Sequence, residues 1–559
     1  MTTLLLCGQL SFSKGEYLVS VFLDIKGAFD FVNVKLLAAR LKYLGVPNKF
    51  CDFIYCLFQF KDLYIQHNDG YINRYSFTGV PQGCVLSPLC FNLYINEVFN
   101  GFPDDVHILA YADDIAIFSS DPDPYIARTR VQDALSNINR KLSELQLTLS
   151  TTKTKAMIFT RRRLDSLLVG PLTINGQQIA YVDTFNFLGF TFQKKLLLRA
   201  HVDNISHNCF HFINVLRSLC GVSWGSDCIC LLRLYIGLIR PRIEYMAPLL
   251  LECKQTELLK LQRIQWKAIR IALGAMMSAH TLCMEQIANI LPIPERLGML
   301  SENLINKMLS NANHPSRTFL FQLALIPDGP VFVKKFAFKL QRNKIYTLNL
   351  HPMFSVPFEA LILKPVVKFL PVKKNIDPSV VARYFKQFLG RWQGYERVYT
   401  DGSKTSTHVG CGIWFPNINI EAYFPLHPLS SIYAAEALAI VEALKLILVQ
   451  NNKKFLIISD SKSVLTAISS FTNSRTHPLI FQIKSILHNL KTVGFIINFL
   501  WVPSHLGIEG NEYVDHVAST HIAALESEKI FVNDLKAADK SESLISWQKR
   551  RLYIRPFFV

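Results

Sequence analysis

Short apolar runs and longer helical patterns alternate along the first third of the chain. The run YLVSVFLDI (17–25) is apolar and ends beside an acid, which predicts a strand. HILAYADDIAIFSS (107–120) is apolar on both sides of an acidic pair, which predicts a β-hairpin with its tight turn at the two acids. Residues 87–99 have helical spacing, and residues 134–150 form an amphipathic helical pattern. The alternation over residues 16–195 therefore predicts an α/β domain.

The pattern changes twice in the middle of the chain. Residues 200–310 are mostly helical by pattern, with basic side chains recurring along them. Two interpretations stay open for this stretch: a helical bundle with a solvated basic face, or a bundle that contacts nucleic acid. Over residues 311–390 prolines recur and basic pairs stand at Lys334–Lys335 and Lys373–Lys374, which predicts a linker or a loosely folded connection.

The last third again has the pattern of a compact α/β unit, with an acid in each of its main elements. The segments that carry these acids are 397–404 with Asp401, 431–445 with Glu436, 454–463 with Asp460, and 501–518 with His505 and Asp515. The first and third segments predict strands that end at their acids, the first with a turn at Gly402. The second predicts a strong helix, and the fourth predicts a loop followed by a helix that begins just before its aspartate.

Length and composition limit the class of protein. The 559 residues are too many for one ordinary core, and about three to four domains are expected. Half of the residues are hydrophobic and 12% are aromatic, which excludes wholesale disorder. The net charge of +18 favours a polyanionic partner, because the neutralisation of phosphates releases condensed counterions.

The cysteines and the apolar stretches exclude further classes. The 12 cysteines contain no C-x-x-C pair, so no zinc finger can be drawn from them, and they indicate buried, reduced thiols in an intracellular protein. The N-terminus lacks the basic start of a signal peptide, and no run approaches the ~20 apolar residues of a membrane span. We therefore expect no membrane contact and an intracellular location, in the nucleus, the cytoplasm or both.

The carboxylates of the last third gain meaning as a set. Taken singly, an aspartate after a strand is usually a turn or helix-capping residue, and a loop histidine has many uses. Four carboxylates at two strand ends and on two helices can, however, converge on one pocket, where they repel one another unless cations neutralise them. Two Mg²⁺ ions about 4 Å apart do this, and they also activate a water and stabilise the leaving oxygen in phosphodiester hydrolysis.

The order of these motifs resembles type 1 ribonuclease H over residues 395–520. The matching motifs are TDGS, A-x-E within a helix, a strand ending SDS, and H-x-G-x-x-G-N-E-x-x-D. In that family the acids of these motifs bind two metal ions, and in this chain the matching acids are Asp401, Glu436, Asp460 and Asp515. The resemblance also implies that His505 assists product release or proton transfer, and that the domain cuts the RNA strand of an RNA–DNA hybrid.

A second acidic set lies in the first third of the chain. It comprises DIKGAFDFV (24–32), GVPQGCVLSPLCFNLYIN (79–96) and YADD (111–114). Hairpin aspartates alone are usually turn formers. An acid at a strand end, here Asp24, together with the hairpin pair Asp113–Asp114 can instead form a two-metal site for nucleotidyl transfer.

These three motifs resemble the palm of reverse transcriptases, particularly those of jockey-like non-LTR retrotransposons. The resemblance implies that Asp24 and Asp113 hold the metal ions and that Asp114 supports them. Phe29 matches the aromatic gate that rejects a ribose 2′-hydroxyl, and Gln82 matches the residue that contacts the incoming nucleotide.

Further matches extend the resemblance downstream. Lys153 or Lys155 falls where the next palm motif carries a basic residue, and FLGF (187–190) resembles the primer grip. The helical stretch 200–300 resembles the thumb and the region after it. Only 23 residues precede Asp24, whereas the family places a fingers subdomain there. We therefore expect an N-terminally truncated chain without the fingers or any upstream endonuclease, in which polymerisation is the weaker expectation.

Together these motifs predict a multidomain α/β (α+β) protein, with a reverse transcriptase palm and helical thumb followed by a ribonuclease H-like mixed-sheet domain. The expected domains are a palm over 1–195, a thumb or connection over 196–310, a proline-rich linker or connection over 311–390, a ribonuclease H domain over 391–525 and an extension over 526–559.

The predicted function is that of a retroelement RNA-directed DNA polymerase and ribonuclease H, with hybrid cleavage as the firmer activity. The alternatives are a ribonuclease H with an inactive palm, and a non-catalytic nucleic-acid-binding remnant. The resemblance implies two Mg²⁺ ions in each site, with Mn²⁺ as a substitute. The implied partners are an RNA–DNA hybrid, an RNA template with a DNA primer, and deoxynucleotides if the palm is active.

Overall fold

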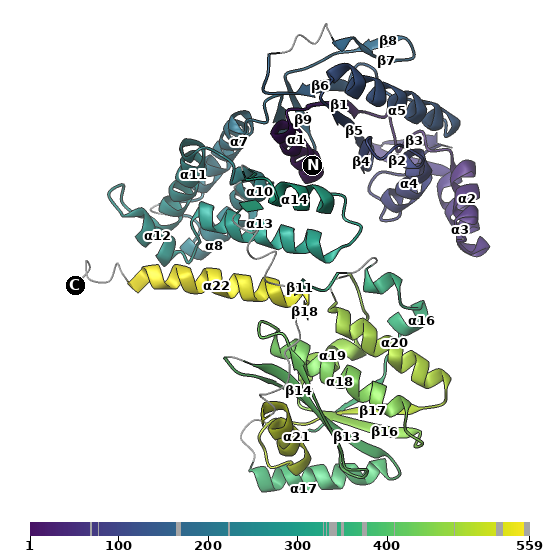
Figure 1. The fold of residues 1–559 in the computed structure, drawn as a ribbon, viewed down its shortest axis with the longest axis vertical. Helices are drawn as coiled ribbons and strands as arrows, with labels where there is room; N and C mark the ends of the chain where they lie inside the picture. The colour runs from purple at the N-terminus through teal and green to yellow at the C-terminus, as the bar shows by residue number, and fades with distance from the viewer. Residues whose placement is uncertain are drawn as a thin grey trace. The chain divides into compact units, whose positions relative to one another are not determined.

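The structure is a computed structural model. It describes the chain apart from residues 68–69, 77, 164–168, 222–223, 328, 331–332, 335–343, 348–350, 372–376, 407, 475, 521–528 and 553–559. Its contacts divide the chain into two units, shown in Figure 1. The first unit comprises Met1–Leu297 and Thr318–Lys334, and the second comprises Gly298–Arg317 and Lys335–Val559. The mixed α/β class predicted from the pattern is confirmed.

An antiparallel sheet in the order β4-β5-β1-β6 forms the centre of the first unit. Its strands are β4 (His107–Tyr111), β5 (Asp114–Asp121), β1 (Tyr17–Leu23) and β6 (Lys155–Phe159). Val21 packs into a core that includes the apolar face of helix α5 (Pro124–Glu144), while Phe22 contacts a group of phenylalanine rings on the other face. Because both faces are covered, β1 is buried from Leu18 to Leu23 and is apolar there except for Ser20, instead of alternating. The predicted strand and the predicted hairpin are both confirmed.

The predicted helices of this unit are confirmed, with shifted ends. The first is α4 (Ser87–Ile95), continued by a 3₁₀ turn over Asn96–Phe99. The second, α5, begins well before residue 134, because Asp123 accepts a hydrogen bond from the Tyr125 backbone N–H and Pro124 starts the first turn. The other elements before residue 194 are α1 (Thr2–Lys14), α2 (Val34–Tyr43), α3 (Asn48–Gln59), β2 (Lys61–His67), β3 (Gly70–Ser76), β7 (Leu172–Ile174), β8 (Gln177–Ile179), β9 (Thr184–Phe187) and β10 (Phe190–Gln193).

The remainder of the first unit is helical, as the pattern predicts. Its elements are α7 (Arg199–Ser218), α8 (Cys228–Leu234), a π-helical turn over Tyr235–Ile239, α9 (Arg240–Glu244), α10 (Ala247–Leu250), α11 (Gln255–Leu273), α12 (Thr281–Ile287), the start of α13 (Ile293–Ser310) and α14 (Arg317–Ala324).

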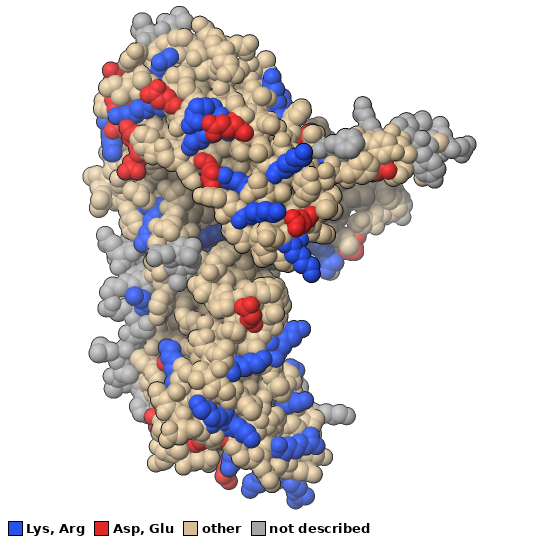
Figure 2. Space-filling view, turned by 90° about the vertical axis from the view of Figure 1, so that its right-hand side faces the viewer, with Lys and Arg blue, Asp and Glu red and all other residues tan. Residues whose placement is uncertain are grey.

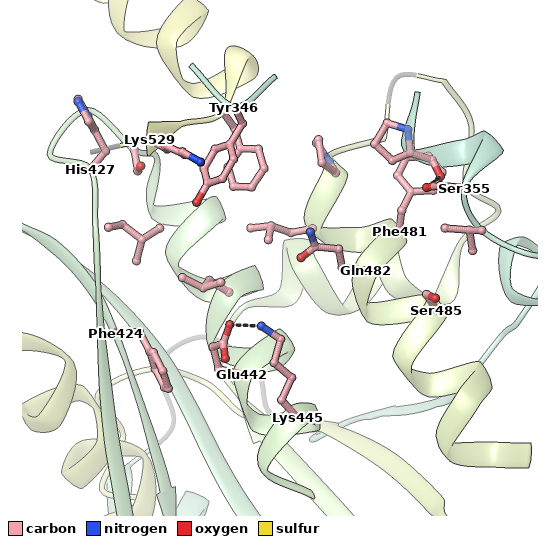
Figure 3. A pocket seen from close by; sticks show the side chains of 18 of the residues that line it. Tyr346, Ser355, Phe424, His427, Glu442, Lys445, Phe481, Gln482, Ser485 and Lys529 are labelled. Carbon is pink, nitrogen blue, oxygen red and sulfur yellow. Dashed lines mark hydrogen bonds and ion pairs between the residues drawn. The ribbon is translucent and has the colours of Figure 1, made fainter. Parts of the chain in front are cut away.

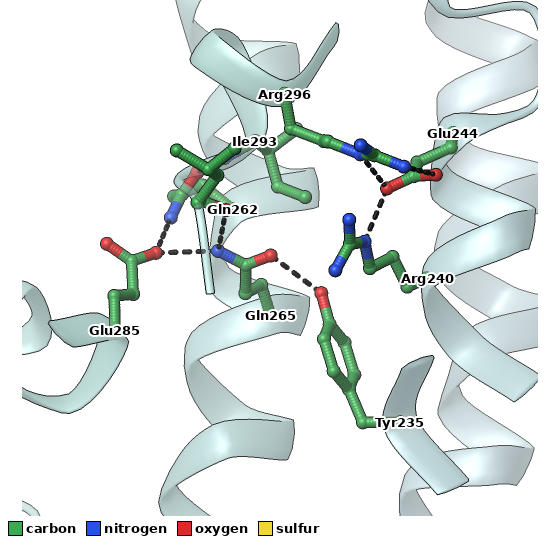
Figure 4. Close-up of polar contacts among 9 residues, drawn as sticks. Tyr235, Arg240, Glu244, Gln262, Gln265, Glu285, Ile293 and Arg296 are labelled. Carbon is green, nitrogen blue, oxygen red and sulfur yellow. Dashed lines mark hydrogen bonds and ion pairs between the residues drawn. The ribbon is translucent and has the colours of Figure 1, made fainter. Parts of the chain in front are cut away.

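A buried polar network joins these helices (Figure 4). The Tyr235 hydroxyl donates to Gln265 Oε1 at 2.6 Å, and Gln265 Nε2 donates to Glu285 Oε1 at 2.7 Å. Burial raises the pKa of Glu285 to about 7, although three side-chain donors oppose this shift. Buried polar groups of this kind favour one packing register, because any other would leave them without partners.

The second unit is built on a six-stranded mixed sheet in the order β12-β17-β16-β13-β14-β15. Its strands are β12 (Val366–Phe369), β17 (Ile496–Trp501), β16 (Lys454–Ser459), β13 (Glu396–Lys404), β14 (Val409–Phe415) and β15 (Ile420–Leu426). Strands β12, β17, β16 and β13 run parallel to one another, β14 pairs antiparallel with β13, and β15 pairs antiparallel with β14. One face packs into a core with α18 (Ile432–Leu448), α19 (Lys462–Ser469) and α20 (Pro478–Thr492), and the other with α17 (Pro378–Leu389) and α21 (Glu509–Thr520).

Two local expectations in this unit are wrong. Strand β13 does not turn at Gly402 but runs on to Lys404, paired with β14. The glycine serves packing: a Cβ there would lie 2.7 Å from the Glu436 backbone nitrogen and 2.9 Å from Ala435 Cβ. Asp515 is not at the start of its helix, because α21 begins at Glu509 and places it in the second turn.

The described part of the proline-rich stretch 311–390 contains several short helices and strands. Strand β12 pairs in parallel with β17 and so extends the sheet, and α17 covers one of its faces. Pro357 and Pro378 stand at the starts of α16 (Phe358–Leu361) and α17, where a missing backbone N–H costs nothing. The short elements β11 (Lys344–Ile345) and Pro352–Phe354 also lie here. Of the basic pairs, Lys335 and Lys373–Lys374 lie outside the described residues.

Helix α22 (Val532–Leu552) belongs to the second unit, where Asn306 Nδ2 donates to Asp539 Oδ2 at 2.9 Å. The short strand β18 (Lys529–Ile530) precedes it. Within the described residues, no helix combines the length and apolarity needed to cross a membrane. Every cysteine is a free thiol, but those at 56, 220, 228 and 230 are exposed, so the expectation of uniformly buried thiols is wrong.

Replacing Gly402 with alanine is expected to destabilise the second unit by ~1–3 kcal/mol, because the new methyl group must push α18 away from β13. Urea unfolding with hydrogen–deuterium exchange over β13 and α18 measures this. Gly390→Ala is the matched control, because that position has helical φ and no atom within 4 Å of an added Cβ. Equal stability of the two variants would contradict the packing role.

Candidate active sites

Three carboxylates of the second unit meet at one edge of its sheet. Asp401 lies within β13, and Asp460 directly follows β16, the parallel neighbour in which Ser459 pairs with Thr400. Glu436 reaches the same place from α18, whose close approach depends on Gly402. One oxygen from each of the three acids lies within 4.8 Å of the others. We call these three residues the acidic cluster.

Burial makes the charge of the acidic cluster costly. Asp401 is 4% exposed and Glu436 is 8% exposed. Burial, followed by the charges of Asp460 and Asp515, raises the pKa of Asp401 to about 9. Burial and the charge of Asp401 raise the pKa of Glu436 well above its ordinary value, and burial raises the pKa of Asp460 as well.

The acidic cluster has the properties of a divalent-cation site. Glu436 Oε2 is buried and has no hydrogen-bond partner among the described residues, so an acceptor is left for another ligand. All the available donors are carboxylate oxygens, which Mg²⁺ and Mn²⁺ prefer. A cation would offset the burial and the mutual repulsion that raise the pKa values of these carboxyl groups.

The structure places the other two predicted residues at the rim of the acidic cluster. Asp515 comes from α21, and its charge is among the causes that raise the pKa of Asp401. Its side chain is 40% exposed, and it lies outside the tightest group of three acids. His505 Nδ1 lies 3.8 Å from Asp515 Oδ2, and the imidazole is 78% exposed on its loop. The rim therefore carries an imidazole that faces solvent.

Two residues beside Asp460 were not singled out from the sequence. Asn511 is buried on α21 and donates from Nδ2 to Asp460 Oδ2 at 3.5 Å. The Trp501 indole N–H donates to the Asp460 backbone carbonyl at 2.9 Å. Asn511 stands four positions before Asp515, one helical turn away, so the helical period could have placed both on one face.

The acids of the first unit gather at one end of its sheet. Leu23, the last residue of β1, pairs with Ile115, so Asp24 comes beside the turn between β4 and β5. Burial, then the charges of Asp113 and Asp24, raise the pKa of Asp114. This site is more open than the acidic cluster, because the Asp24 side chain is 33% exposed. Of the two candidate lysines, Lys153 is the one beside Asp24, with 3.5 Å between Nζ and Oδ2.

The loop that follows Asp24 and the PQG loop are joined by backbone hydrogen bonds. The Val80 N–H donates to the Phe29 carbonyl at 2.8 Å, and the Gly79 N–H donates to the Val32 carbonyl at 2.9 Å. Gly79 has φ 76°, and a Cβ there would lie 2.4 Å from the Asp30 carbonyl oxygen, so only glycine allows this approach.

The two predicted nucleotide contacts occupy different positions on these loops. The Phe29 ring stacks on Phe91, with 4.7 Å between ring centroids, and is partly buried. Gln82 is exposed to solvent. One of these two residues is thus a ring held by stacking, and the other is a solvent-exposed amide.

The FLGF segment forms the tight turn between β9 and β10. Leu188 and Gly189 take φ 50° and 78° at the turn. The Tyr245 hydroxyl donates to the Leu188 carbonyl at 2.6 Å. Burial, followed by the charge of Tyr111 in the YADD hairpin, raises the pKa of Tyr245.

A separate cavity of about 530 Å³ lies in the second unit (Figure 3). Apolar rings such as Phe424, Phe481 and Tyr346 line it. Its one acid, Glu442, accepts from Lys445 Nζ at 2.7 Å and so is already neutralised. The cavity therefore lacks the clustered charge of the two acidic sites.

Comparison with known protein families matches both sites. Residues 7–192 match the family described as reverse transcriptase (RNA-dependent DNA polymerase), and residues 394–523 match the RNase H family. The two matches contain all the acids of the two sites.

Similarity to individual proteins points to mobile elements. The RNA-directed DNA polymerase from mobile element jockey of Drosophila melanogaster is 25% identical over 310 residues, which are 54% of this chain and 33% of that protein. A putative 115 kDa protein in the type-1 retrotransposable element R1DM of the same organism is 23% identical over 42% of this chain and 23% of its own length. The probable RNA-directed DNA polymerase from transposon BS, also from D. melanogaster, is 26% identical over 37% of this chain and 24% of its own length. The aligned part spans about a third or less of these relatives.

Without divalent cations, the stability of the chain is expected to fall as the pH rises from about 6 to 9. The pKa of Asp401 is raised to about 9 in the folded state, so the folded chain holds a proton that the unfolded chain has lost, and unfolding becomes easier as that proton is removed. Thermal unfolding in EDTA across this range measures the effect. Asp401→Asn should flatten the dependence, and added Mg²⁺ should reverse it; a wild-type profile as flat as that of the variant would contradict the cluster's electrostatics.

Proposed function

We propose that the chain is a jockey-like retrotransposon reverse transcriptase with a C-terminal ribonuclease H domain, and that it hydrolyses the RNA strand of RNA–DNA hybrids in a Mg²⁺-dependent reaction. The observation that carries the proposal is the acidic cluster: its three carboxylates have oxygens within 4.8 Å of one another, and Glu436 Oε2 is buried with no hydrogen-bond partner among the described residues.

In this proposal Asp401, Glu436, Asp460 and Asp515 hold two Mg²⁺ ions. Bound there, the ions supply a water of lowered pKa and stabilise the leaving oxygen. Asn511 fixes the Asp460 carboxylate through its hydrogen bond. His505 is exposed beside Asp515, where its imidazole can transfer a proton to the leaving group or assist its release.

The first unit is proposed to extend a DNA primer on an RNA template with deoxynucleotides. Asp24 and Asp113 would hold metal ions there, and Asp114 would support them. The Phe29 ring, held by stacking on Phe91, would reject a nucleotide with a ribose 2′-hydroxyl, and Gln82 would contact the incoming nucleotide. Lys153 partly neutralises Asp24 before any ligand arrives. The FLGF turn would hold the primer end near YADD.

The proposed domains keep the palm at 1–195 and the helical thumb at 196–310. The ribonuclease H domain at 391–525 is joined by β12 and α17, because these elements complete its sheet and cover one of its faces. Residues 526–559 form an extension that contributes α22. Copying an element into chromosomal DNA requires access to the nucleus, so we propose an intracellular protein that reaches this compartment.

Asp460→Asn is expected to lower hybrid cleavage by at least ~100-fold, because it removes a carboxylate ligand while keeping the shape of the side chain. A labelled RNA–DNA hybrid incubated with the full chain and Mg²⁺ measures the effect. Glu359→Gln is the matched control, since Glu359 is an exposed carboxylate of the same unit. An intact hybrid after incubation with the wild-type chain would rule out the proposed ribonuclease.

Primer extension tests the first unit separately. The wild-type chain should add deoxynucleotides to a DNA primer on an RNA template, and Asp113→Asn should abolish this while hybrid cleavage continues. No extension by the wild-type chain, with cleavage intact, would favour a ribonuclease H that carries an inactive palm.

A further inference from the structure

Two aromatic rings and a lysine form a cluster next to Asp460. Phe369 from β12 and Trp501 from β17 are register partners, with 6.1 Å between their ring centroids. Lys462 Nζ from α19 lies 5.9 Å from the Phe369 centroid and 5.6 Å from the Trp501 centroid. We call these three residues the aromatic–lysine cluster.

Hydrogen bonds tie this cluster to the acidic cluster. The Asp460 backbone carbonyl accepts from the Trp501 indole N–H at 2.9 Å and from the Lys462 backbone N–H at 3.0 Å. The carboxylate of the same aspartate belongs to the acidic cluster. A shift of Trp501 or Lys462 would therefore be transmitted directly to a proposed metal ligand.

The sheet register orders these residues along one edge. Ser459 of β16 pairs with Trp501, which in turn pairs with Phe369. Since neighbouring strands lie ~4.8 Å apart, Phe369 is two spacings, ~10 Å, beyond the strand that carries Asp460. The aromatic–lysine cluster thus lies at the same end of the strands as Asp460, toward the outer strand β12.

The outer part of the cluster is open to a partner. Phe369 is 41% exposed, and Lys462, Lys364 and Lys368 are exposed as well. Figure 2 shows one face of the second unit on which Lys and Arg outnumber Asp and Glu. An exposed ring among cations suits a polyanion with flat, partly apolar groups, such as nucleic acid.

We propose that the aromatic–lysine cluster binds the DNA strand of the hybrid whose RNA strand is cut at the acidic cluster; this inference rests on the proposed function. The minor groove is ~6 Å wide in B-DNA and wider in A-form helices, so a point ~10 Å from the cut phosphate meets the opposite backbone. Phe369 packs against a sugar there, and Lys462 contacts a phosphate. Phe369 lies outside the part of the chain that matches the RNase H family, so β12 supplies this contact in addition to that domain.

The test measures hybrid binding by full chains that carry Asp401→Asn, so that cleavage does not interfere. Phe369→Ala should weaken binding by ~5–20-fold through the lost ring contact, and Phe369→Tyr should restore it. Lys462→Ala should weaken binding by ~3–10-fold and lower the salt dependence by about one counterion. Phe358→Ala, which removes a 64% exposed ring from α16, should change affinity less than twofold.

Neutral methylphosphonate linkages, placed one at a time along each strand of the hybrid, show whether the cluster contacts the DNA strand or the RNA strand. A single DNA linkage should weaken binding by the parent chain and have no further effect on Lys462→Ala. Unchanged affinity in both alanine variants, or sensitivity confined to the RNA strand, would overturn the inference. The proposed function is tested separately by cleavage with the chain that retains Asp401. A chain that does not cut the hybrid but shows this binding pattern would refute the proposed function and still support binding by the aromatic–lysine cluster.

Discussion

The cost of placing several carboxylates in one buried site governs the second unit. Two like charges ~4 Å apart repel by ~4 kcal/mol at an effective dielectric constant of ~20. Asp401 and Glu436 are both buried, and burial together with the neighbouring carboxylates raises their pKa values. The fold imposes this cost through a strand interior and a helix that cannot move apart. Such an arrangement is useful only where cations arrive to neutralise it.

Glycines in the sheet allow the helices that carry the acids to pack close against it. Gly402 lets α18 approach β13, and Gly412 of the neighbouring strand does the same for α21, where a Cβ would lie 2.9 Å from both the Ala518 nitrogen and the Val514 carbonyl oxygen. Each glycine therefore sets the distance from a helix to the sheet and, through it, the position of an acid. Gly79 has the corresponding role in the first unit, where it brings the PQG loop against the loop after Asp24.

The two acidic sites differ in how they manage charge. The site in the first unit is partly open to solvent and has Lys153 close to Asp24. Asp401 and Glu436 of the acidic cluster are buried, and the exposed imidazole of His505 lies at its rim, 3.8 Å from Asp515. An open site such as that of the first unit suits a substrate that carries its own phosphates and bound ions. A closed site such as the acidic cluster would hold its ions tightly and accept only a nucleic-acid backbone that reaches the ends of these strands.

The sequence alone determined the composition of both sites, because their motifs are local: each acid stands in a short segment whose hydrophobic pattern predicts its strand, helix or turn. The roles of these residues stay predictions, although the structure brings the three inner acids of the second unit together and sets Asp515 and His505 at the rim. What the sequence could not show depends on contacts between distant segments. Gly402 resembles a turn residue until α18 is seen against it, and Asn511 gains its role only when α21 reaches β16. The prolines before β12 favour a linker, yet this strand pairs with β17 more than a hundred residues later. Strand pairing and helix docking join residues that no local pattern relates, so only the tertiary structure decides them.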